Sequence, residues 1–223
     1  GDDDPPRNCA VAFFGEGAAS EGDFHAALNF AATLAAPCLF VCRNNGYAIS
    51  TPSREQMRGD GIASRAPGYG AHALRVDGND ALAVREAVAA ARQLCVRESA
   101  PVIVEAMTYR LAHHSTSDDS TRYRPVEEIR AHAEGGRHPI ARLRAYMHAR
   151  GWWADDDEER LRAAARAAAQ RALERGEAKG PPSRHTLFED VFDEMPVELR
   201  RQRDELEQHL AEFPDEYADV GKH

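Results

Sequence analysis

Two short motifs carry the side chains best suited to bind a metal ion and a phosphate group. Gly15-Glu16-Gly17 follows one apolar run, and Asn44-Asn45-Gly46-Tyr47 follows the next apolar run along the chain. Glu16 and Asn45 offer side-chain oxygens, which Mg²⁺ prefers as ligands, and glycines let a bulky anion approach the backbone. Each motif alone is more often an ordinary turn. Together, at this spacing, they predict a site where a carboxylate, an amide and a backbone carbonyl bind Mg²⁺ and leave room for a diphosphate.

A second polar cluster, residues 113–120 (HHSTSDDS), follows a later strand-like run. Taken alone, such a loop is more often a solvated turn. Its place after a strand, near the predicted metal site, favours a functional loop instead. Histidine changes its charge near neutral pH, so a histidine of this loop is suited to proton transfer.

The elements that must position these motifs alternate between strands and helices. Strands are predicted at 9–14, 37–43, 73–76 and 101–108, and helices at 21–35 and 80–97. Continuous apolar runs such as 9–14 are typical of parallel strands buried on both faces. We therefore predict an α/β fold with an open, mostly parallel sheet and helices on both faces. Ligands bind outside the carboxyl ends of strands in such sheets, where both motifs lie.

The character of the sequence changes after residue 125. Helices are predicted at 139–150, 156–175 and 196–212. We therefore expect an α/β domain over 1–125 and a C-terminal helical extension over 126–223 that forms a subunit interface. The chain begins at Gly1 without a methionine, and a strand follows almost at once, so we expect a fragment of a larger domain.

Composition narrows the class of protein. The net charge of −9 argues against nucleic acid or an acidic membrane surface as the main partner, because both require a basic surface. No apolar run approaches the roughly 18 residues of a transmembrane helix. Cys9, Cys38, Cys42 and Cys95 form no CxxC pair. The first three lie in apolar runs, so we expect buried thiols in a reducing compartment rather than disulfides or zinc ligands.

Longer stretches around the motifs extend the pattern. They are 14–23 (FGEGAASEGD), 42–52 (CRNNGYAISTP), 58–63 (RGDGIA), 76–80 (VDGND) and 105–110 (EAMTYR). Together they resemble the alpha subunits of 2-oxo acid dehydrogenases, which depend on thiamine diphosphate, over nearly the whole chain. Many thiamine enzymes have Asp where this chain has Glu16, whereas the branched-chain subunits that it resembles have Glu. The loop HHSTSDD at 113–119 resembles the branched-chain members rather than the pyruvate-specific ones.

The resemblance implies a ligand set. Glu16 and Asn45 would bind Mg²⁺ through side-chain oxygens, and Tyr47 through its backbone carbonyl. Arg43 would pair with the cofactor diphosphate through its two-pronged guanidinium group. The residues implied to bind the cofactor are Gly15, Glu16, Gly17, Arg43, Asn45 and His114.

The resemblance also gives roles to the histidine loop. His114 would be the catalytic residue of this chain, contacting the diphosphate and assisting proton transfer while the acyl group moves. Ser115 matches an inhibitory phosphorylation site. A phosphate there would sit beside Asp118 and Asp119, and charge repulsion should disorder the loop. The position of the family's second phosphoserine is occupied by Pro125.

The implied reaction is oxidative decarboxylation of branched-chain 2-oxo acids of the 3-methyl-2-oxobutanoate type, in branched-chain amino acid catabolism. The acyl group then passes to lipoyl groups of an acyltransferase component. The implied partners are a beta subunit in an α2β2 heterotetramer, the lipoyl domain, and a regulatory kinase and phosphatase. The implied compartment is the mitochondrial matrix, with a bacterial cytoplasm as the alternative. K⁺ contacts would belong to the family's upstream part.

Three other interpretations stay open at this point. The chain could belong to a pyruvate dehydrogenase alpha subunit, or to a catalytically inactive regulatory or structural subunit. It could also be a different α/β enzyme that uses Mg²⁺ and a nucleotide. The sequence has neither a P-loop nor a G-x-G-x-x-G motif, which argues against that third interpretation.

Overall fold

The computed structural model describes residues 8–134 and 136–217. The chain divides into two compact units, residues 1–153 and 154–223, each described separately below. The first unit contains the sheet and the candidate site. The second unit is helical.

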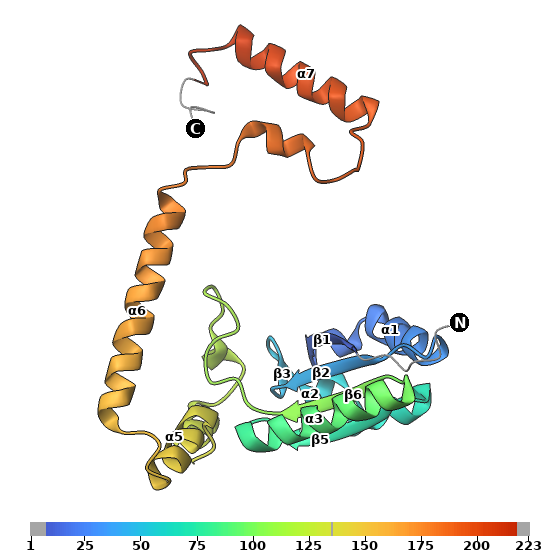
Figure 1. The fold of residues 1–223 in the computed structure, drawn as a ribbon, viewed down its shortest axis with the longest axis vertical. Helices are drawn as coiled ribbons and strands as arrows, with labels where there is room; N and C mark the ends of the chain where they lie inside the picture. The colour runs from blue at the N-terminus through green and yellow to red at the C-terminus, as the bar shows by residue number, and fades with distance from the viewer. Residues whose placement is uncertain (1–7, 135, 218–223) are drawn as a thin grey trace. The chain divides into compact units, whose positions relative to one another are not determined.

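A four-stranded parallel sheet forms the centre of the first unit (Figure 1). Its order is β1 (Ala10–Gly15), β2 (Cys38–Asn44), β6 (Val102–Met107) and β5 (His72–Asp77). All neighbouring pairs are parallel. This confirms the predicted α/β fold with an open parallel sheet. A small antiparallel pair, β3 (Tyr47–Ala48) with β4 (Thr51–Pro52), follows β2.

Helices cover both faces of this sheet, as predicted. On one face, α1 (Gly22–Thr33) and the 3₁₀ helix η2 (Ala63–Tyr69) pack against Phe40 and Ile103. On the other face, α3 (Ala81–Glu98) packs against Leu39. Alternation along β2 and β6 separates the two cores, because neighbouring strand residues point to opposite faces. The side chain of Asp80 caps α3 by accepting from the backbone N–H groups of Leu82 and Ala83.

Strand β1 differs from its prediction. It is an edge strand among the described residues, and Val11 and Phe13 are 49% and 80% exposed. A hollow of about 510 Å³ lies over its apolar face, lined in part by Val11, Phe13 and Val41. The prediction of a parallel strand is confirmed, but the prediction that it is buried on both faces is wrong for this structure. An edge position leaves β1 with one paired neighbour, and α3 does not cover it.

The cysteines are free thiols. Cys42 and Cys95 are buried, as expected for Cys42, whereas Cys9 and Cys38 are only partly buried. Burial raises the pKa of Cys42 to about 12 and that of Cys95 to about 11, so both are protonated and inert at neutral pH.

Most of the remaining elements of the first unit follow β6. They are η3 (Ser120–Arg122), α4 (Val126–Glu134) and α5 (Pro139–Ala149), while η1 (Ala18–Ser20) and the short helix α2 (Ser53–Gln56) lie earlier in the chain. Arg142 joins α5 to the turn after β5 through Asp77 at 2.6 Å and Asp80 at 3.0 Å.

The second unit contains α6 (Asp155–Glu177), η4 (Arg184–Phe188) and α7 (Val197–Glu212). A two-pronged ion pair joins Arg184 to Glu207 of α7. The described part of the predicted extension is therefore helical. Its role at a subunit interface, and the boundary at 125, stay predictions. Across the described ranges, no helix is long and apolar enough to span a membrane.

Candidate functional site

The two predicted motifs meet at the carboxyl ends of β1 and β2. The register pairs Gly15 with Arg43, so the residues that follow each strand become neighbours. Glu16 is 1% exposed. Its Oε2 atom accepts hydrogen bonds from the backbone N–H of Asn45 at 3.0 Å and from Asn45 Nδ2 at 3.4 Å.

A pocket of about 400 Å³ opens at this edge of the sheet. It brings together six of the predicted site residues, namely Gly15, Glu16, Gly17, Asn45, Tyr47 and His114. Sequence reasoning missed a further lining residue, Glu21, which precedes α1. Arg43 is exposed at the end of β2, and Ser115 is exposed beside His114; neither lines this pocket.

The oxygens at this pocket fit a hard divalent cation. Asn45 Oδ1 is shielded from solvent and has no hydrogen-bond partner within the part of the chain that the structure describes. Burying an amide oxygen without a hydrogen bond costs about 1–3 kcal/mol of folding free energy, and a bound metal ion would offset that cost. The Tyr47 carbonyl accepts one long bond, 3.3 Å from Arg110 Nη1, and keeps its second lone pair.

This ligand set combines a carboxylate, an amide and a carbonyl. No group of three or more His, Cys, Asp or Glu residues in 8–134 and 136–217 could hold a metal ion. An Mg²⁺ site with one carboxylate and a bound phosphate does not require such a group.

The turn after β2 is fixed by its own hydrogen bonds. The buried Asn44 accepts from the backbone N–H of Gly46 at 3.1 Å. Gly46 has φ +87°, a left-handed conformation that glycine adopts without strain. The carbonyl of Gly46 in turn accepts from the backbone N–H of Ser53. The backbone is therefore held so that Asn45 and Tyr47 both face the pocket.

An aromatic cluster holds the Tyr47 ring. The hydroxyl groups of Tyr47 and Tyr109 both donate to Glu128 Oε1, at 2.9 and 3.0 Å. The guanidinium of buried Arg124 lies over both rings. Burial and the hydrogen bond to Glu128 raise the pKa of Tyr109 to about 12, so its hydroxyl keeps its proton. Glu128 could not be identified from the sequence, because its contact with Tyr47 spans 81 positions.

The His114 loop is closed by Asp118. Its Oδ2 atom accepts from the backbone N–H of His114 at 2.8 Å and from the Tyr123 hydroxyl at 2.6 Å. These bonds lower the pKa of Asp118, the tyrosine hydroxyl having the larger effect. Ser115 and Ser117 lie within hydrogen-bond distance of each other through their hydroxyls.

Arg110 links this loop to the turn after β2. Its guanidinium donates to the carbonyls of Tyr47 and Ile49 and to the Tyr123 hydroxyl, the last two at 2.6 and 2.9 Å. Arg124 reinforces the same segment by donating to the backbone carbonyl of Arg110 and, at 2.7 Å, to that of Ala112. Neither arginine received a role from the sequence.

The long segment between β4 and β5 clamps the turn that carries Glu16. Gln56 Nε2 donates to the carbonyl of Glu16 at 2.6 Å and to Ser20 Oγ at 2.8 Å. Arg65 Nη1 donates to the carbonyl of Ala19 at 2.5 Å. These hydrogen bonds hold the turn after β1 in place.

Comparison with known proteins identifies the family of this chain. The family described as dehydrogenase E1 component matches residues 5–184. The chain belongs to this family. It is 55% identical over 212 residues to the mitochondrial 2-oxoisovalerate dehydrogenase subunit alpha of Dictyostelium discoideum, covering 95% of this chain and 48% of that protein.

Other relatives carry the same kind of name. The human mitochondrial 2-oxoisovalerate dehydrogenase subunit alpha is 52% identical over 93% of this chain and 46% of its own length. The Arabidopsis thaliana mitochondrial subunit alpha 2 is 47% identical over 94% of this chain and 44% of its own length. The chain thus spans about half the length of the curated relatives it matches.

Proposed function

We propose that this chain supplies the thiamine diphosphate and Mg²⁺ site of a branched-chain 2-oxo acid dehydrogenase alpha subunit. The observation that carries the proposal is the shielded, unpartnered Asn45 Oδ1 beside buried Glu16, in a pocket that His114 also lines. Identity of 47–55% to proteins named as 2-oxoisovalerate dehydrogenase alpha subunits supports the substrate class.

In this proposal the chain's own residues hold and orient the cofactor. Glu16, Asn45 and the Tyr47 carbonyl bind Mg²⁺, and Arg43 pairs with the diphosphate. Gly17 has little room for a side chain, since a Cβ there would lie 3.1 Å from that of Ala48. Thiamine diphosphate, when bound, supplies the electron sink for decarboxylation of a 2-oxo acid.

His114 is the proton-transfer residue in this proposal. Its place at the pocket mouth lets its imidazole face both the cofactor and an incoming lipoyl group. Its orientation depends on the loop, because Asp118 holds its backbone N–H.

Phosphorylation of Ser115 would act on this loop. The exposed hydroxyl is open to a kinase, and a phosphate would add about −1.5 to −2 charges beside Asp118. Repulsion would weaken the bonds from Asp118 to His114 and Tyr123, and the loop would lose its ordered form. A regulatory kinase and phosphatase are therefore part of the proposal.

The proposed partners are a beta subunit, in an α2β2 heterotetramer, and the lipoyl domain of an acyltransferase component. Exposed apolar side chains in the helical unit support a protein partner, including Leu161 and Leu173 of α6, which are 58% and 57% exposed. The mitochondrial names of the relatives support a mitochondrial matrix location. A K⁺ site would lie in residues that the relatives have in addition.

The test measures CO₂ release by this chain within a subunit of the relatives' full length, co-expressed with a beta subunit. The assay supplies thiamine diphosphate, Mg²⁺ and an artificial electron acceptor, and compares 3-methyl-2-oxobutanoate with pyruvate. We expect preference for the branched acid and loss of activity in Glu16→Ala. Preference for pyruvate would overturn the substrate class. Tight cofactor binding without CO₂ release from either acid would instead indicate an inactive regulatory subunit.

A further inference from the structure

A buried carboxylate lies behind the candidate site, on the central strand β6. Glu105 is 0% exposed and pairs in register with Cys42 of β2 and Arg75 of β5. A charge in the interior of a sheet is costly unless donors surround it, so its presence calls for an explanation. Nothing in the proposed chemistry uses Glu105 directly, because it does not line the pocket.

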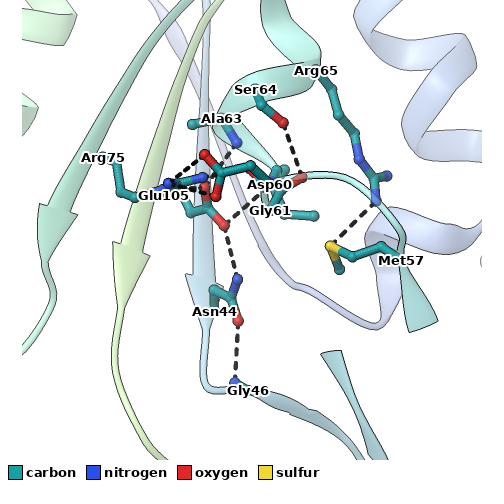
Figure 2. Close-up of polar contacts among 11 residues, drawn as sticks. Asn44, Gly46, Met57, Asp60, Gly61, Ala63, Ser64, Arg65, Arg75 and Glu105 are labelled. Carbon is teal, nitrogen blue, oxygen red and sulfur yellow. Dashed lines mark hydrogen bonds and ion pairs between the residues drawn. The ribbon is translucent and has the colours of Figure 1, made fainter. Parts of the chain in front are cut away.

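Four donors satisfy both oxygens of Glu105 (Figure 2). Oε1 accepts from Asn44 Nδ2 at 2.8 Å and from the backbone N–H of Ile62 at 3.0 Å. Oε2 accepts from the backbone N–H of Ala63 at 2.9 Å and from Arg75 Nε at 3.0 Å. Burial alone would raise the pKa of Glu105, but these hydrogen bonds together outweigh it and lower the pKa, so the group is ionised at neutral pH.

The first arm of this network reaches the turn after β2. Asn44 donates to Glu105 through Nδ2, and its Oδ1 accepts from the backbone N–H of Gly46 at 3.1 Å (Figure 2). Both ends of the Asn44 amide are thus engaged, which fixes its rotamer. Asn45 and Tyr47, the proposed metal ligands, flank Gly46 in the same turn.

The second arm reaches the turn after β1. Glu105 anchors Ile62 and Ala63 at the start of η2, and Arg65 of the same helix donates to the carbonyl of Ala19. Ala19 lies three residues after Glu16 and is buried. One carboxylate therefore supports both turns that carry the proposed metal ligands.

The RGDG motif of residues 58–61 is explained by the same network. A Cβ at Gly61 would lie 2.6 Å from Glu105 Oε1 and 2.8 Å from Arg75 Nη2, and its φ is +69°. Asp60 accepts from Arg75 Nη1 at 3.0 Å and holds the outer side of the guanidinium. Gly61 and Asp60 of the motif thus pack against Glu105 and its partner Arg75.

We propose that Glu105 is a positioning residue for the metal–diphosphate site, acting through the Asn44 amide on the turn that carries Asn45 and Tyr47. The inference rests on the proposed function, since it assumes that these residues bind Mg²⁺. Partners behind metal ligands commonly account for about 10–100-fold in metal affinity.

The test measures Mn²⁺ binding by electron paramagnetic resonance in the presence of thiamine diphosphate, using the full-length subunit assembled with a beta subunit. Glu105→Gln keeps the shape and removes the charge, and we expect the Kd for Mn²⁺ to rise at least about tenfold. Asn44→Asp keeps the acceptor for Gly46 but loses the donor to Glu105, and should cause a similar loss.

The double variant N44D/E105Q exchanges donor and acceptor across the Asn44–Glu105 bond. Its affinity for Mn²⁺ should be at least about threefold higher than that of E105Q, because the two sites are coupled. Recovery should be partial, since turning the new amide toward position 44 leaves the Ile62 N–H without its acceptor. A purely structural role for Glu105 gives recovery of affinity only in proportion to recovery of the melting temperature.

Arg75→Lys is the matched control, because it alters the same network on the side away from Asn44. We expect it to lower the melting temperature with less than about threefold change in Mn²⁺ affinity. Binding by E105Q within twofold of wild type, or affinity that falls in proportion to melting temperature in both E105Q and Arg75→Lys, overturns the inference. Absence of Mn²⁺ binding in the wild-type protein would instead overturn the proposed function, and the inference with it.

Discussion

The turns after β1 and β2 line the same pocket as the His114 loop, but different kinds of contact hold them. The turns rest on buried groups: Glu16 is 1% exposed, Asn44 3% and Glu105 0%. Their hydrogen bonds lie where water cannot compete, so breaking one leaves a buried polar group unsatisfied. This region is built to keep one geometry.

The His114 end of the loop is held near the surface. Its closing residue Asp118 bonds His114 and Tyr123 near the surface, and His114 and Ser115 are exposed. Water can replace these bonds at little cost, so local opening needs much less free energy than it does in the core. The difference is consistent with the proposed cofactor site, held rigidly, beside a loop that the proposed phosphorylation of Ser115 would open.

Glu16→Ala should give the largest effect, because it removes the buried carboxylate of the rigid region. We expect Mn²⁺ binding in the presence of thiamine diphosphate to fall below detection, and decarboxylation with it. Glu21→Gln is the control, since that carboxylate lines the same pocket but is exposed. Equal losses in the two variants would mean that pocket charge, rather than ligation by Glu16, governs metal binding.

His114→Ala should separate the two regions. Acyl transfer to a lipoyl domain should slow by roughly 10²–10⁴-fold, the usual contribution of a positioned proton-transfer group. Mn²⁺ affinity should change less than about threefold, because the metal ligands belong to the buried turns. The paired measurement is the rate of lipoyl acylation and the Mn²⁺ Kd, with His113→Ala as a control. Loss of Mn²⁺ binding in His114→Ala would show that the His114 loop and the buried turns do not act independently.

The same contrast explains what the sequence could predict. Both motifs fall at one edge because parallel strands end together, so Glu16 and Asn45 could be placed side by side from periodicity alone. The exposure of β1 could not, because its run of apolar residues predicts burial and does not show which elements lie beside it. Which neighbour a strand acquires is a property of the fold.

Two polar networks also escaped prediction. Arg110 and Arg124 lie in a polar segment where arginines are common, and their partners are backbone carbonyls that no pattern identifies. Glu105 did carry a signal, since it interrupts the apolar strand VIVEAM, where an ionised side chain requires buried donors. The positions of those donors, from 44 to 75, depend on long-range pairing.

Arg110→Lys tests the link between the two regions. A lysine offers one compact charge, whereas Arg110 reaches the Tyr47 carbonyl, the Ile49 carbonyl and the Tyr123 hydroxyl together. We expect amide hydrogen exchange in 113–120 to accelerate about tenfold, with a smaller loss of Mn²⁺ affinity. Arg122→Lys, an exposed change in the same segment, should leave both unchanged. An unaltered loop in Arg110→Lys would show that Arg110 does not hold it closed.

Asp118→Asn should give the smallest effect, since the amide still accepts from His114 and Tyr123 but loses its charge. We expect roughly two- to threefold faster exchange of the His114 amide at neutral pH, after correction for intrinsic rates. The wild-type loop should behave similarly only in acid. Because hydrogen bonds from Tyr123 and His114 lower the pKa of Asp118 below its ordinary 3.8, the ionised, bonded form persists above that pH and is lost as pH falls through the lowered value. Asp119→Asn is the matched control, as that carboxylate bonds Thr121 instead. Equal amide hydrogen exchange in the two variants would show that Asp118 does not hold the loop closed. The proposed phosphate on Ser115 would then have to act on a different contact.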